Sequence, residues 1–173
     1  MVEQCLNGNE ASQKLLFETY GPKMLALCSR YARHRLEAED IFQEAFVKVF
    51  NKLHQFEKQG SLEWWIRRIM INTAIKYLKK GSVKNELLGV EDLPEMHVNP
   101  DAISHLCEEE LMGVINSLPD GYRLVFNMYA IEGMNHKEIA EELGIGESTS
   151  RSQLVKARKL LQHKIIELQK VCL

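Results

Sequence analysis

Positive charge is concentrated in one short stretch near the C-terminal end of this 173-residue chain. Residues 147–173 hold six basic and two acidic side chains, whereas residues 108–146 hold two basic and eight acidic ones. Arginine and glutamine side chains hydrogen-bond to base edges, and lysine side chains contact phosphates. A helix through this stretch, at 100° per residue, would gather such groups on one side. The side chains that it would present to a DNA major groove are Thr149, Arg151, Ser152, Gln153, Val155, Lys156 and Lys159.

The residues before this stretch predict the supports that such a helix needs. Residues 137–143 predict a short helix with Ile139, Ala140 and Leu143 turned inward, and Ala140 is small enough for a second helix to cross closely. Gly144 permits the positive φ of a tight turn. This pattern predicts a DNA-binding helix-turn-helix, with an ordinary helical hairpin as the alternative. The long helix that follows would bury Leu154, Ala157, Leu161, Ile165 and Leu168.

One residue fits the long helix poorly. Ser150 falls on its inward side, where an apolar side chain is expected. It could serve in part as an N-terminal cap residue, which leaves the docking angle of the helix open.

A second basic stripe lies between residues 64 and 80, which hold five basic side chains and no acidic one. Bases stack on aromatic rings while cations track phosphates, so the stripe predicts contact with single-stranded or melted nucleic acid. The rest of this helix is apolar over most of its circumference, as in a buried helix. The alternative is that Trp64 and Trp65 belong to the core, and we expect at least one of them to be buried. The stripe consists of Trp65, Arg68, Asn72, Lys76 and Lys79.

A third feature is one apolar residue, Val47, in the middle of a polar helix side. The helix over residues 38–53 would bury Ile41, Ala45 and Val49 on its opposite face. A single exposed apolar residue is ordinary in any protein, so it alone decides nothing. The alternative is a protein-binding face with Val47 as its anchor. The polar side chains around it are Asp40, Gln43, Glu44 and Lys48.

The sequence on both sides of a linker predicts helices, and these features lie on them. Gly21-Pro22 predicts a break between a first helix and one over residues 23–33, and Ser61 is a candidate cap for a helix that ends at Lys80. Residues 81–107 are acidic, contain two prolines and lack periodicity, which is typical of a linker. We therefore expect an all-α fold with two small helical domains, an N-terminal bundle and a C-terminal helix-turn-helix, joined by a flexible acidic linker. The expected ranges are 1–80, 81–107 and 108–173, with C-terminal helices over 108–117, 121–131, 137–143 and 148–170.

Other classes of protein are less consistent with the sequence. The chain has no phosphate-binding G-x-x-x-x-G-K-[ST], no G-x-S-x-G and no H-E-x-x-H motif, so we expect no catalytic residues and no enzyme. Its four cysteines form no C-x-x-C pair, and His105 with Cys107 lacks a second half, so we expect no metal and no cofactor. There is no signal peptide and no apolar run of membrane-spanning length, which predicts a cytoplasmic protein without membrane insertion.

Taken together, these segments resemble the sigma-70 family of bacterial RNA polymerase sigma factors, and within it the extracytoplasmic-function group. Residues 40–50 resemble the segment of the family that grips the β′ clamp of the polymerase. Residues 56–74 resemble the loop and helix that recognise and melt the −10 element, and residues 118–158 resemble the helix-turn-helix that reads the −35 element. The resemblance covers about residues 8–168.

The resemblance implies a transcription initiation factor that binds core RNA polymerase, at its β′ clamp and β flap, and directs it to promoter DNA. Asp40, Gln43, Glu44, Val47 and Lys48 would then form the polymerase face. The family is commonly held inactive by an anti-sigma factor, which is a further expected partner, and no small-molecule substrate is expected. The single-stranded −10 DNA would meet Phe56, Ser61, Leu62, Trp65, Arg68, Asn72, Lys76 and Lys79.

Two other functions remain open from the residues alone. A free-standing helix-turn-helix regulator would bind an operator without polymerase, and its N-terminal module would dimerise or bind a ligand. A helical adaptor would bind only proteins, and substitution of Arg68, Arg151 or Lys156 would have no effect on it.

Overall fold

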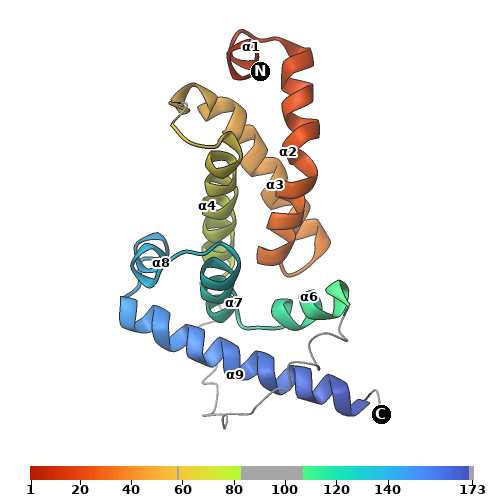
Figure 1. The fold of residues 1–173 in the computed structure, drawn as a ribbon, viewed down its shortest axis with the longest axis vertical. Coiled ribbons are helices and arrows are strands. Elements are labelled where there is room, and N and C mark those ends of the chain that lie inside the picture. Colours follow the sequence, from red (N-terminus) through yellow and green to blue (C-terminus); the bar gives the residue numbers. More distant parts are fainter. Residues whose placement is uncertain (58, 83–106, 172–173) are drawn as a thin grey trace. The chain divides into compact units, whose positions relative to one another are not determined.

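The computed structural model describes residues 1–57, 59–82 and 107–171 (Figure 1). Every regular element within those ranges is a helix. The chain divides into two compact units, Met1–Leu78 and Lys79–Leu173. The predicted all-α fold with two helical domains is thereby confirmed. Residues 83–106, most of the predicted linker, lie outside the described residues.

Four α-helices and a short 3-10 turn build the N-terminal part. They are α1 (Val2–Leu6), α2 (Glu10–Tyr31), α3 (Arg35–Lys52), the turn η1 (Leu53–Gln55) and α4 (Leu62–Ser82). The side chain of Asn9 caps α2 by accepting a hydrogen bond from the Ser12 N–H at 2.9 Å. The His34 ring caps α3 in the same way, through the Glu37 N–H at 3.2 Å. Such caps satisfy N–H groups that the first helical turn leaves without partners.

The core of this unit lies where α2, α3 and α4 meet. Its fully buried residues include Leu16 and Met24 from α2, Ile41 from α3, and Ile66 and Met70 from α4. The Cys28 sulfur lies 4.0 Å from the Met70 sulfur, which joins α2 to α4 inside this core. Burial of such side chains from water supplies most of the stability of a small helical unit.

A single helix, α2, runs through the Gly21-Pro22 step, so the predicted break is wrong. Proline has no N–H, and it therefore cannot donate the intrahelical hydrogen bond to the Glu18 carbonyl. Glu18 and Pro22 both lie on the exposed side of α2, where water can hydrate that carbonyl. Packing of the opposite side against the rest of the unit outweighs the local penalty. The buried residues that continue across the step are Leu16, Gly21, Met24, Leu27 and Cys28.

Helix α4 also passes its predicted end. It continues through Gly81 to Ser82, two residues beyond the expected stop at Lys80. Its start at Leu62 agrees with the expected position after Ser61, whose carbonyl accepts a hydrogen bond from the Trp65 N–H at 3.1 Å.

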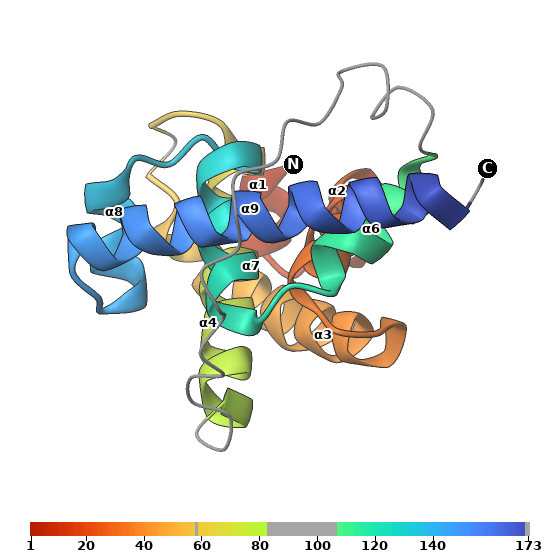
Figure 2. The ribbon, with the colours of Figure 1, turned by 90° about the horizontal axis from the view of Figure 1, so that it is seen from below.

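The C-terminal part contains α6 (Glu108–Asn116), α7 (Asp120–Phe126), the π-turn η2 (Asn127–Ile131), α8 (His136–Leu143) and α9 (Glu147–Val171). The helix predicted over 121–131 is thus α7 followed by a π-turn. Figure 2 shows α9 as the long helix of this part, with α8 and α6 toward its opposite ends. The core of this C-terminal part includes Val114, Ile115, Leu118, Ala157, Leu161 and Ile165.

The turn between α6 and α7 is held by a buried arginine. Arg123 is 2% exposed, and its guanidinium donates hydrogen bonds to the Asn116 carbonyl at 3.0 Å and the Leu118 carbonyl at 3.4 Å. It also pairs with the Asp120 carboxylate at 2.9 Å. Buried carbonyls at a helix end need such donors, so Arg123 fixes the angle at which α7 follows α6.

Candidate nucleic-acid interfaces and protein-binding face

The predicted helix-turn-helix is present and is capped at both ends of its first helix. The Asn135 side chain accepts hydrogen bonds from the Lys137 and Glu138 N–H groups at 3.0 Å, and the Glu138 carboxylate accepts one from the Asn135 N–H at 2.8 Å. Gly144 ends α8 with φ +68°, in the left-handed region that favours glycine. Helix α9 begins at Glu147, one residue earlier than predicted.

The N-terminal half of α9 presents most of the predicted DNA-contact residues outward. Val155 is 51% exposed, and Lys159 is half-buried. The Arg151 guanidinium pairs with the Glu147 carboxylate at 2.8 Å. An exposed ion pair of this kind contributes only about 0–1 kcal/mol, so Arg151 can exchange it for another acceptor. The residues fully on the exposed side are Thr149, Arg151, Ser152, Val155 and Lys156.

Gln153 differs from the other predicted contacts. Its side chain is half-buried and lies against α7, where a Cβ on Gly121 would be 3.5 Å from the Gln153 Nε2. The Gln153 Oε1 atom is buried and accepts no hydrogen bond from the described residues. A helical wheel places this side chain at the edge of the polar face, but the missing side chain at Gly121 lets it lie on α7 instead.

The sequence did not reveal a side-chain array behind the exposed face. Ser150 is fully buried, and its hydroxyl lies 2.9 Å from the His136 Nδ1 atom at the start of α8. The His136 ring stacks on the Tyr129 ring, with centroids 4.8 Å apart and planes at 24°. The Arg158 Cζ atom lies over the same Tyr129 ring, 5.7 Å from its centroid. The array therefore joins η2, α8 and two positions of α9.

The basic stripe of α4 lies partly in the open. Arg68, Lys76 and Lys79 are exposed, while Asn72 is half-buried. The expectation that one tryptophan would be buried is wrong, because Trp64 is 64% exposed and Trp65 is only half-buried. The remaining core faces of α3 and α4 fill the interior without them.

The loop before α4 is tied to the stripe by two aromatic rings. The Phe56 and Trp65 rings have centroids 5.7 Å apart and planes at 54°. Ser61 is exposed and Leu62 half-buried on the same approach to α4. The ring contact thus places Phe56 of the loop beside Trp65 of the stripe.

The predicted protein-binding face on α3 is exposed. Val47 is 59% exposed, and Ile41, Ala45 and Val49 on the opposite face are fully buried, as expected. Lys48 is half-buried, pairs with Glu44 and lies 3.4 Å from the Thr73 hydroxyl of α4. Val47 therefore lies among exposed polar groups with its side chain in solvent. Those groups are Asp40, Gln43 and Glu44.

Asp40 also has a partner inside the unit. Burial raises the pKa of the Tyr77 hydroxyl, and the Asp40, Glu37 and Glu44 carboxylates raise it further. The Tyr77 hydroxyl hydrogen-bonds to Asp40, so the protonated phenol is the form that the site holds. Asp40 is thereby oriented from α4, while its side chain is still accessible from outside.

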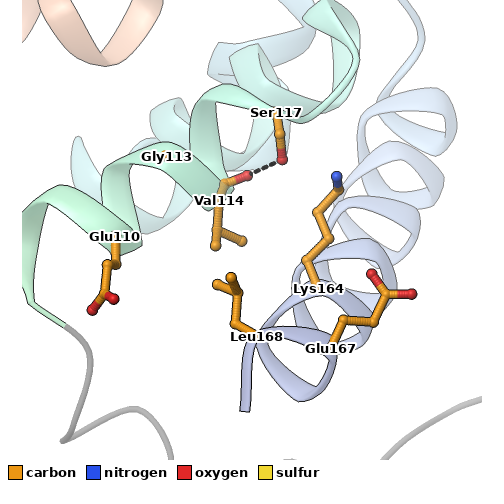
Figure 3. A pocket seen from close by; sticks show the side chains of 7 residues that line it. All are labelled: Glu110, Gly113, Val114, Ser117, Lys164, Glu167 and Leu168. Carbon is orange, nitrogen blue, oxygen red and sulfur yellow. Dashed lines mark hydrogen bonds between the residues drawn. The ribbon is translucent and has the colours of Figure 1, made fainter. Parts of the chain in front are cut away.

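A groove of about 410 Å³ lies between α6 and α9 (Figure 3). The expectation that Leu168 would be buried is wrong, since it is 37% exposed at this groove. Its lining comes from α6 and α9. The lining residues are Glu110, Gly113, Val114, Ser117, Lys164, Glu167 and Leu168.

No group of three or more His, Cys, Asp or Glu side chains lies close enough to hold a metal ion in the described ranges. Within the same ranges, no helix is both long and apolar enough to cross a membrane.

Two family models match the chain, one on each unit. "Sigma-70 region 2" matches residues 16–83, and "Sigma-70, region 4" matches residues 108–161. The first contains α4 and the α3 face, and the second contains the helix-turn-helix with the exposed half of α9.

Curated relatives match over nearly the whole length. The chain is 27% identical to the ECF RNA polymerase sigma-E factor of Haemophilus influenzae, over 95% of the chain and 93% of the relative. It is 28% identical to the sigma-E factor of Escherichia coli, over 95% of the chain and 92% of the relative.

Solved structures share the fold. The sigma factor RpoE in complex with the anti-sigma factor NepR from Bartonella quintana aligns with a TM-score of 0.58 and 19% identity, over 89% of this chain and 96% of that one. CnrH in complex with the cytosolic domain of CnrY aligns with a TM-score of 0.54 and 18% identity, over 96% and 95%.

Proposed function

The chain belongs to the extracytoplasmic-function group of the sigma-70 family, and from that premise we propose how its surfaces divide the work of transcription initiation. It is an initiation factor that binds core RNA polymerase and directs it to promoter DNA. Members of the family are non-catalytic, so RNA synthesis itself stays with the polymerase. We place its action in the cytoplasm, together with the polymerase.

The C-terminal unit, expected from residue 108 onward, reads the −35 element. The observation that carries this assignment is the exposed N-terminal half of α9, whose side chains project from a capped helix-turn-helix. Arg151 contacts a base edge, and Lys156 and Lys159 contact phosphates. Thr149, Ser152 and Val155 line the same face, and Gln153 supports it from the side of α7.

The N-terminal unit, expected to span residues 1–80, holds the melted −10 element. Trp65 and Phe56 offer aromatic surface for an unstacked base, and Arg68, Lys76 and Lys79 follow the strand. Ser61, Leu62 and Asn72 border the place where the base would lie. Extrusion of a base costs a few kcal/mol, which these contacts offset.

The α3 face binds the polymerase clamp. Its exposed Val47 is surrounded by Asp40, Gln43 and Glu44, an arrangement of one apolar anchor within a polar rim. Lys48 completes the rim through its pair with Glu44. We also include an anti-sigma factor among the partners, since one aligned structure holds a sigma factor in complex with an anti-sigma factor.

Reconstitution with core polymerase tests this function. The free chain should bind duplex promoter DNA weakly, and addition of core polymerase should produce initiation at specific promoters. Operator binding that needs no polymerase would favour a free-standing regulator. Failure to initiate at any promoter of the source genome would contradict the proposal. Unchanged activity after substitution of Arg68, Arg151 and Lys156 would favour a protein-binding adaptor.

A further inference from the structure

The buried hydroxyl of Ser150 has a specific partner on the preceding helix. Ser150 is 0% exposed, on the same side of α9 as the buried Leu154 and Ala157. A buried hydroxyl destabilises a fold unless it is hydrogen-bonded. The His136 Nδ1 atom, 2.9 Å away, supplies that bond from the first residue of α8.

The His136 ring is itself fixed by contacts that do not involve Ser150. The capping box of Asn135 and Glu138 anchors the backbone at His136, and the Tyr129 ring lies against the imidazole, with centroids 4.8 Å apart. His136 therefore presents Nδ1 to α9 in one orientation. A group that is fixed by its own neighbours can position a second group.

Tyr129 contacts α9 a second time. The Arg158 Cζ atom lies over the Tyr129 ring, 5.7 Å from its centroid, so the guanidinium makes a cation–π contact with that ring. Ser150 and Arg158 are eight residues apart, which is about 12 Å along a helix. The Tyr129–His136 pair thus contacts α9 at two positions. His136 contacts Ser150 in the first turn, and Tyr129 contacts Arg158 about two turns later.

We propose that His136 and Ser150 are positioning residues for −35 recognition, which set the rotation of the first turn of α9 about its own axis. This inference rests on the proposed function of the C-terminal unit. Thr149 and Arg151 flank Ser150 directly, so any rotation at Ser150 moves both exposed side chains relative to the bases. Neither positioning residue needs to touch DNA.

The rest of the core explains why the His136–Ser150 bond affects the orientation of the first turn of α9 more than it affects folding. Leu154, Ala157, Leu161 and Ile165 hold α9 on the unit whether or not the Ser150 bond forms. Loss of the bond therefore leaves the helix in place while it frees the first turn. Base contacts are sensitive to shifts of about 0.5 Å, whereas apolar packing tolerates them.

The test uses the full chain with core polymerase and promoters whose −35 element is randomised. The variants are Ser150→Ala, His136→Phe and the double substitution. His136→Phe keeps a ring to stack on Tyr129 but removes Nδ1. Each single variant should lower initiation at the preferred promoter about 3- to 10-fold, the value of one hydrogen bond, and flatten the −35 preference. The double variant should be no worse than either single one, because both remove the same bond.

His136→Asn separates the bond from the stack. The Asn side chain keeps a polar atom near the position of Nδ1 but has no ring for Tyr129. We expect it to retain the −35 preference of the parent chain. If His136→Asn flattens the preference as strongly as His136→Phe, ring stacking positions α9 and the proposal is overturned. The comparison of His136→Asn with His136→Phe also tests the proposal if Ser150→Ala fails to fold, since His136 is only half-buried.

Glu141→Gln, on the exposed side of α8, is the matched control and should leave the preference unchanged. Thermal unfolding of each variant supplies the structural readout. Lowered stability with an unchanged −35 preference, or losses that add in the double variant, would overturn the proposal while the −35 assignment stands. A parent holoenzyme without any −35 preference would overturn both.

Discussion

Val47 is an exposed apolar residue that the core of its unit does not need. Its apolar side chain is 59% exposed between carboxylates and an amide. The α3 core face is complete without it, so the fold gains little from a valine there. Its role is best tested by a change that alters the surface and leaves the core intact.

Val47→Asp should weaken binding to core polymerase at least about tenfold, because it places a charge where the proposed complex would bury an apolar anchor. The dissociation constant for core polymerase measures this effect, with thermal unfolding as the check on the fold. Leu15→Asp is the matched control, since Leu15 is 53% exposed on α2 and outside the proposed face. Equal affinity of the Val47→Asp variant and the parent chain would contradict the assignment.

Substitutions of Arg151 and Lys156 should have different effects on promoter binding. Arg151→Ala should cost about 1–3 kcal/mol at the preferred promoter and relax selectivity at one base pair, whereas Lys156→Ala should weaken all promoters alike and reduce the salt slope by about 1. Promoter-binding titrations at several salt concentrations measure both. If Arg151→Ala weakens every −35 sequence equally, Arg151 contacts phosphate instead of a base.

Cys28 provides a test of the N-terminal core. Burial raises the pKa of its thiol to about 12, against the opposing effect of the Arg30 guanidinium. The folded state holds this proton more tightly than the unfolded state. Stability from this group is therefore present below about pH 9 and falls as the pH rises from about 9 toward 12.

Iodoacetamide at pH 8 should modify the exposed Cys107 of the native chain and leave Cys28 unmodified until denaturant is added. Peptide mass spectrometry measures each site separately. Modification of Cys28 at the rate of Cys107 would show that the α2–α4 core opens readily.

At the scale of elements, the α6–α7 turn depends on one side chain. Arg123→Ala leaves the Asn116 and Leu118 carbonyls without these donors and should lower the free energy of unfolding of the C-terminal unit by about 1–3 kcal/mol. Chemical denaturation, followed by a probe in each unit, measures the change. The exposed Lys137→Ala is the control. An equal shift in the N-terminal unit would contradict a local role for Arg123.

The elements themselves were largely predictable from periodicity and caps. Ser61, Gly144 and the apolar spacing of α8 and α9 predicted helix positions to within a residue or two. Pro22 was not predictable in this way, because its local penalty is outweighed by packing between helices distant in sequence. Leu168 was misassigned because periodicity predicts an inward side but not whether a neighbour covers it.

The candidate surfaces were likewise predictable only in part. The exposed faces of α3 and α9 followed from the helical period, whereas Gln153 did not, because its position depends on the missing side chain of Gly121. Ser150 was visible as an irregularity in the sequence. Its partner was not, since His136 is fourteen residues away and meets it only through the geometry of the Gly144 turn.

At the scale of the whole molecule, the net charge of −2 conceals two basic surfaces. One lies on α4 and the other on α9, in two different sigma regions. Acidic residues in neighbouring segments offset both in the total. A factor that directs polymerase to promoters would benefit from this balance, because low net charge limits binding to unrelated DNA.

The ion pair between Glu147 and Arg151 bears on how the holoenzyme searches a chromosome. Under the proposed −35 assignment, Arg151 would keep Glu147 as its partner on unrelated sequence, and the nearby carboxylate would repel phosphates. At the preferred base the arginine would exchange Glu147 for the base edge, at a loss of about 0–1 kcal/mol. We expect short dwell times at wrong sites and rapid onward scanning, with prolonged arrest only where the −35 sequence offers a better acceptor.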